Sequence, residues 1–158
     1  DSIPGFGRRV AVLCVSEFGV RLSQFPSAAH AASWAKLAPG NTVSAGKRSS
    51  SRVGKGNQWL RATMVQAAHA AVKVKDSYLA AFYGRLVARR GAKKAIMAVA
   101  HKLLVLAYTL LRTREMYEER GAAALDERSK DRLIHSMQRR FDRLGYIVHL
   151  EPKASVGV

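Results

Sequence analysis

The chain has 158 residues, of which 48% are apolar, so it is long enough for one well-buried domain. It contains one cysteine, which excludes an internal disulfide framework. Its formal net charge of +16 arises within residues 18–114, where seventeen Lys and Arg face a single carboxylate, Asp76. Such a field attracts a polyanion, so we expect nucleic acid as the partner and no membrane. Residues 1–20 lack the basic leader and apolar stretch of a secretory signal, which predicts a cytoplasmic location.

We expect one domain over 1–158, with its core at about 3–150, that begins with a tight glycine turn at 3–9 and a helix to about Glu17. The turn resembles half of a helix-hairpin-helix, in which backbone N–H groups hold a phosphate, although a simple glycine turn fits the pattern equally well. Four residues of this turn are candidate nucleic-acid contacts: Gly5, Gly7, Arg8 and Arg9.

About six helices are expected in all, which predicts a mainly α fold. Three helices after the first have candidate N-cap residues in the sequence. Ser27 would cap a helix to about Lys36, Asn57 would cap one at 58–72, and Asp76 or Ser77 would cap one that stops at Gly91.

The most apolar helix is expected at 92–113. Its composition raises the question of a membrane span, but His101 and Lys102 interrupt the run, so we predict the centre of the core. After a linker at 115–125, Asp126 is expected to cap a last helix that ends at Gly145. Residues 146–150 resemble one short C-terminal strand.

A basic loop is predicted at 38–56, with Ser44 at its centre and no carboxylate. Cations beside a serine hydroxyl suit attack on a phosphodiester, which would leave a phosphoserine link. On composition alone Ser49, Ser50 and Ser51 compete with Ser44, and a loop that only grips phosphate is the more ordinary alternative. The candidate phosphate contacts in the loop and the helix after it are Gly46, Lys47, Arg48, Arg52, Lys55, Asn57 and Arg61.

Two other kinds of site do not fit the sequence. Metal-dependent cleavage of DNA needs two or more carboxylates around Mg²⁺, and the basic region offers only Asp76, so we expect no metal site in this chain. A Walker A loop fails because five residues separate Gly40 from Gly46 where four are required, and Arg48 replaces the Ser or Thr.

Short motifs follow one another along nearly the whole chain: Ile3-Pro4-Gly5-Phe6-Gly7, Trp34-Ala35-x-Leu37-x-Pro39-Gly40, Ser44-Ala45-Gly46-Lys47-Arg48, Gly54-Lys55-Gly56-Asn57-x-Trp59-Leu60-Arg61 and Arg89-Arg90-Gly91-x-Lys93-Lys94. In this order and spacing they resemble the C-terminal domain of the insertion-sequence transposases of the IS-one-ten type. Many members carry Ser-Gly-Gly where this chain has Ser44-Ala45-Gly46.

The resemblance implies a recombinase with two parts, an N-terminal RuvC-like domain whose four acidic residues bind Mg²⁺ and a C-terminal domain with a serine nucleophile. We expect this chain to be the second part only, with Ser44 forming a covalent phosphoserine link to DNA. The resemblance also implies a structured noncoding guide RNA and a homo-oligomeric full-length enzyme. The isolated domain is expected to be inactive, and a non-catalytic module that docks guide RNA or duplex DNA is the alternative.

Overall fold

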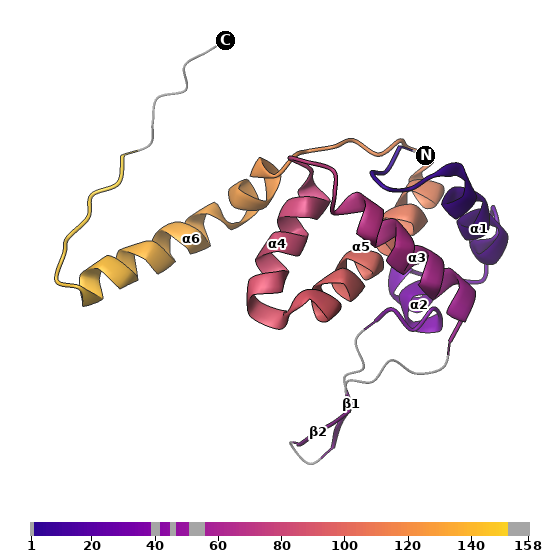
Figure 1. Ribbon diagram of the computed structural model, residues 1–158, viewed down its shortest axis with the longest axis horizontal. Helices are drawn as coiled ribbons and strands as arrows, with labels where there is room; N and C mark the ends of the chain where they lie inside the picture. The colour runs from indigo at the N-terminus through magenta and orange to yellow at the C-terminus, as the bar shows by residue number, and fades with distance from the viewer. Residues whose placement is uncertain (1, 39–41, 45–46, 51–55, 152–158) are drawn as a thin grey trace, which may run out of the picture. The chain divides into compact units, whose positions relative to one another are not determined.

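The computed structural model describes residues 2–38, 42–44, 47–50 and 56–151 and confirms the mainly α fold (Figure 1). It has two units, Asp1–Ala122 and Ala123–Val158, and each is described by itself. The elements in chain order are α1 (Arg8–Phe18), α2 (Ala28–Trp34), β1 (Thr42–Ser44), β2 (Lys47–Ser50), α3 (Gln58–Ala71), α4 (Tyr78–Arg90), α5 (Ala92–Thr113) and α6 (Ala123–Arg143).

Helix α5 is the centre of the first unit and packs against α2, α3 and α4, as predicted for the core helix (Figure 1). It is the one helix in the described part of the chain that is long and apolar enough to cross a membrane, a test that core helices also pass. Its buried Val99, Leu103 and Leu104 are fully covered. Alanines at the buried positions of α2 and α3 let these helices approach the core closely.

The predicted caps explain where three helices begin. Ser27 accepts a hydrogen bond from the His30 N–H at the start of α2, and Asn57 Oδ1 accepts from the Leu60 N–H at 3.0 Å at the start of α3. Of the two candidates for α4, the structure uses Ser77, whose Oγ accepts from the Ala80 N–H at 3.1 Å. Each cap satisfies one of the backbone donors that a helix N-terminus leaves without a partner.

Two details of the second half differ from the prediction. Helix α6 begins at Ala123, so Asp126 lies inside the helix and does not cap it, because the alanines before it are strong helix formers. Residues 146–150 form no strand and have no strand partner among the described residues. The end of α6 at Gly145 is as expected, since Gly145 has φ +82° and the Tyr146 N–H bonds to the Phe141 carbonyl at 3.0 Å.

The predicted linker has an ordered part. Its Glu119 Oε1 accepts hydrogen bonds from the Tyr78 N–H at 2.9 Å and from the Gly121 N–H at 2.8 Å. Tyr78 is the first residue of α4, so this carboxylate lies at a helix N-terminus, where the helix dipole stabilises negative charge. Glu119 therefore fastens the linker to the start of α4.

Candidate nucleic-acid interface

The centre of the basic loop is a two-stranded antiparallel hairpin, which the sequence did not predict. Ser44 ends β1 and its Cα pairs with that of Lys47, the first residue of β2. Val43 pairs with Arg48 one step further along. Two residues connect the strands, so Ser44 and Lys47 form the last pair before the connection. Cross-strand partners of this kind are close neighbours, which puts a cationic residue next to the candidate nucleophile.

The register also separates the competing serines. Ser50 pairs with Thr42 at the open end of the hairpin. The register shifts between Thr42 and Val43, so Ser49 falls between two paired positions of β2, in the manner of a β-bulge. Ser51 lies outside the described residues, as do three of the predicted phosphate contacts, Gly46, Arg52 and Lys55.

The turn at the start of the chain uses Gly5 for packing. The Phe6 N–H bonds to the Ile3 carbonyl at 3.0 Å, and Gly5 has φ +75°, a conformation that glycine adopts without strain. A Cβ on Gly5 would lie 2.7 Å from the Ala67 carbonyl oxygen of α3 and would also meet the Ala71 backbone nitrogen. The close approach that Gly5 permits is therefore to α3, and its contact with a phosphate stays a prediction.

The other three candidates of the turn lie at the N-terminus of α1. Gly7 is the N-cap residue and provides no side-chain cap, and its surroundings are open. Arg8 and Arg9 are exposed on the first turn of the helix. A helix N-terminus with two exposed arginines is favourable for an anion, but the contact of these residues with nucleic acid stays a prediction.

Asn57 and Arg61 both belong to the start of α3. Asn57 is half-buried and its Oδ1 is used by the cap, which leaves its amide N–H groups for other partners. Arg61 is half-buried in the first turn, and its backbone N–H bonds to the Asn57 carbonyl at 3.1 Å.

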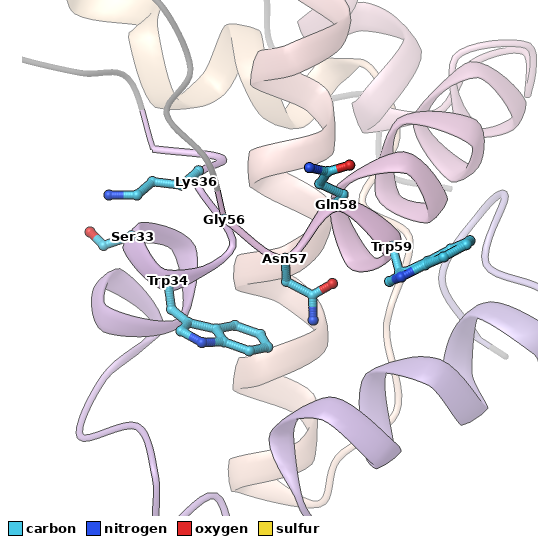
Figure 2. Close-up of a pocket in the computed structure, with 7 residues that line it drawn as sticks. All are labelled: Ser33, Trp34, Lys36, Gly56, Asn57, Gln58 and Trp59. Carbon is cyan, nitrogen blue, oxygen red and sulfur yellow. The ribbon is translucent and has the colours of Figure 1, made fainter.

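An open pocket of about 740 Å³ lies where the basic loop leaves α2 and enters α3, and residue-by-residue reasoning missed it (Figure 2). Its lining contains both tryptophans of the chain and no carboxylate: Ser33, Trp34, Lys36, Gly56, Asn57, Gln58 and Trp59. The sequence signal that could have found it is the placement of the two tryptophans on either side of the loop.

The two indoles have different surroundings. The Trp34 ring packs on Phe25, with ring centroids 5.2 Å apart, and is 39% exposed. Trp59 is 80% exposed. Figure 2 shows the Trp59 indole pointing away from Trp34, with the Asn57 amide between them in the view. Trp34 is thus a supported wall of the pocket, whereas Trp59 presents a ring to solvent.

Lys36 reaches the pocket from a strained backbone. It follows α2 with φ +52°, where glycine is the usual residue, and a non-glycine residue in this region costs on the order of 1 kcal/mol. The turn is a Schellman motif, because the Leu37 N–H bonds to the Ala32 carbonyl at 3.0 Å and the Lys36 N–H to the Ser33 carbonyl at 3.1 Å. The Lys36 stem then lies against Gly56 at the other end of the loop.

A second pocket, of about 470 Å³, lies beside the C-terminal ends of α1 and α5. Three exposed arginines contribute to its lining, Arg21, Arg112 and Arg114, and no carboxylate does. These cations add to the positive surface of the first unit.

Nothing in the described ranges offers a metal site, because no three His, Cys, Asp or Glu side chains come together there. His101 has a buried Nδ1 without a hydrogen-bond partner in the described residues. Burial, with the charge of Lys102 as a second cause, lowers the pKa of His101, so the ring is neutral at pH 7.

The model of the transposase IS116/IS110/IS902 family matches residues 1–84. This range is more than half of the chain and contains the glycine turn, the hairpin and every predicted site residue. It also contains the pocket lined by Trp34 and Trp59. Comparison with curated proteins and with solved structures found no similar protein. The chain therefore belongs to the IS116/IS110/IS902 family of transposases, a class of enzymes that cleave and rejoin DNA.

Proposed function

We propose that the chain supplies the serine nucleophile of a DNA transposase and that Ser44 is this nucleophile. One observation carries the proposal: Ser44 is paired with Lys47 at the closed end of a hairpin, within the part of the chain that matches the transposase family. The other described serines of the loop pair at the open end or fall at the register shift.

The proposed step is a transesterification. The Ser44 Oγ forms a bond to the phosphorus of a DNA phosphodiester, the bond from phosphorus to one deoxyribose oxygen breaks, and that oxygen leaves as a hydroxyl after taking up a proton. The proton of the serine passes to a base. Lys47 and Arg48 neutralise charge that builds up on the phosphoryl oxygens, and attack by a hydroxyl of a second strand reverses the step and rejoins DNA.

The rest of the catalytic site is proposed from the family resemblance. The described residues do not form a Mg²⁺ site, so the carboxylates for that ion would come from an acidic RuvC-like domain. A homo-oligomer would bring such a domain to Ser44 from a partner subunit. A structured guide RNA would select the target by base pairing, and this chain would hold the backbone.

The test is to trap the protein–DNA adduct. The intact enzyme that contains this chain is incubated with guide RNA and DNA, denatured and resolved by gel electrophoresis. Ser44→Ala should abolish the adduct, whereas Ser50→Ala, at the open end of the same hairpin, should retain it. An undiminished adduct from Ser44→Ala would show that Ser44 is not the nucleophile.

A second candidate function is a non-catalytic module that docks nucleic acid. The pocket that Trp59 lines favours this function, because its lining contains no carboxylate and Trp59 is exposed. Docking of nucleic acid in this pocket requires no nucleophile. In that case Ser44→Ala leaves recombination intact, while Lys47→Ala and Arg48→Ala weaken binding. Each of these two variants would also make the salt dependence of binding shallower.

A further inference from the structure

The exposure of Trp59 is the starting point. Its neighbour Leu60 is fully buried in the core, yet the indole of Trp59 stays 80% exposed. A tryptophan presents a large apolar face, and leaving it in water forgoes a burial that normally stabilises a fold. The position is fixed by the first turn of α3, which Asn57 caps, so the exposed ring sits on a rigid helix rather than on a mobile tail.

The pocket beside this ring has the chemistry of a nucleotide site. Its volume of about 740 Å³ falls within the range of about 300–1,000 Å³ typical of small-ligand pockets. Amide side chains such as Asn57 and Gln58 form hydrogen bonds with base edges, and an aromatic ring stacks on the face of a base. Lys36 supplies a cation for a phosphate, and no carboxylate in the lining would repel one.

We propose that one unpaired base of the DNA strand on which the transposase acts stacks on the exposed Trp59 indole at the edge of this pocket, with Lys36 neutralising a phosphate farther along the same strand. Only an unpaired base exposes the face that stacking requires, because a duplex covers its bases with their neighbours. The choice of DNA over RNA rests on the proposed function, in which Ser44 attacks DNA. Both ends of the loop that carries Ser44 meet at the pocket, so we expect the pocket to bind the same strand.

Lys36 supports the same occupant. Its left-handed backbone would suit glycine better, so the side chain is held at the pocket at a cost to stability. Lys36→Met removes the cation and keeps the stem that lies against Gly56, so the contact between the two ends of the loop is retained. Strand binding should then weaken and its salt slope should fall by about 0.7, the value expected for one phosphate contact with a single strand. An unchanged slope would remove Lys36 from the site.

The experiment uses tryptophan fluorescence of the 158-residue chain. In the Trp34→Phe background Trp59 is the only indole, and stacking on a base should quench it. The probes are a single-stranded DNA of about 12 nucleotides, its duplex and an RNA of the same sequence. The single strand should quench strongly and the duplex weakly. Quenching by RNA alone, or by neither single strand, would overturn the proposal.

Three variants at position 59 separate aromatic stacking from nonspecific apolar contact. Trp59→Phe keeps an aromatic face and should bind single-stranded DNA within a few-fold of the parent, whereas Trp59→Leu should lose about tenfold, since stacking is worth about 1–3 kcal/mol per base. Trp59→Ala should resemble Trp59→Leu. Equal binding by all three would contradict the proposal, and because the side chain is 80% exposed the variants should fold. Arg112→Ala, outside this pocket, is the charge control and should leave the quenching at saturation unchanged.

The two proposals fail independently. If Ser44 is not the nucleophile, Ser44→Ala retains the DNA adduct while the Trp59 variants still discriminate between single-stranded and duplex DNA. If the pocket holds no base, Ser44→Ala still abolishes the adduct, but quenching and the Trp59→Leu defect are missing.

Discussion

Gly56 lies so close to Lys36 that a Cβ on Gly56 would come within 2.9 Å of the Lys36 Cβ. The same Cβ would lie 2.9 Å from the Trp34 carbonyl oxygen. The two ends of the basic loop are thus in van der Waals contact, and both residues line the pocket that contains Trp34 and Trp59 (Figure 2).

Replacing Gly56 should therefore disturb both stability and binding. We expect Gly56→Ala to lower the free energy of unfolding by about 1–3 kcal/mol, because the new methyl group overpacks against Lys36 and the backbone at Trp34. The measurement is urea denaturation. Gly84→Ala is the matched control: Gly84 lies in α4 with open space around it, so the change should stabilise the chain by about 0.5–1 kcal/mol. A Gly56→Ala protein as stable as the parent would contradict the contact.

Gly5 should be important for the fold whether or not the turn holds a phosphate. Its φ of +75° disfavours any side chain by about 1–2 kcal/mol, and the backbone of α3 blocks the space for a Cβ. Gly5→Ala should thus destabilise the chain by about 2 kcal/mol or more in thermal or urea unfolding. Gly7→Ser provides the contrast, because Gly7 is an exposed N-cap residue, where serine should be neutral or slightly stabilising. Similar losses from both changes would argue against this packing role.

Glu119 should stabilise α4 from 41 residues away. Loss of its charge in Glu119→Gln weakens the interaction with the helix N-terminus and the hydrogen bond to the Tyr78 N–H, so we expect a cost of about 1 kcal/mol in urea denaturation. The neighbouring exposed Glu118 has no such bond among the described residues, and Glu118→Gln should change little. If the two variants were equally stable, the carboxylate would have no capping role.

His101 should make the fold sensitive to mild acid. Because burial lowers its pKa in the folded state below 6.5, the unfolded chain binds a proton first as the pH falls, and stability decreases from about pH 6.5 downward until the folded-state pKa is passed. His101→Leu should flatten this part of the curve when unfolding is followed between about pH 7 and pH 5. A parent curve without a slope in this window would contradict the prediction.

Features that depend on neighbouring residues could be predicted from the sequence. The caps Ser27, Asn57 and Ser77 and the stop at Gly145 follow from hydrogen bonds within a few positions, so the pattern of residues is sufficient. The apolar run at 92–113 likewise predicted the core helix. The start of α6 was misplaced because an Asp inside a helix and an Asp before one look alike in sequence.

The sequence by itself determined the mainly α fold and the basic region, since periodicity and composition carry that information, while the choice of Ser44 came from the family resemblance and stays a prediction. Only the tertiary structure decided that Ser44 pairs with Lys47, that Gly5 packs on α3, and that Trp34, Lys36 and Trp59 share a pocket. The physical reason is distance along the chain: these relationships join residues across a turn, between helices or across the whole loop, and such contacts depend on how the helices pack around α5.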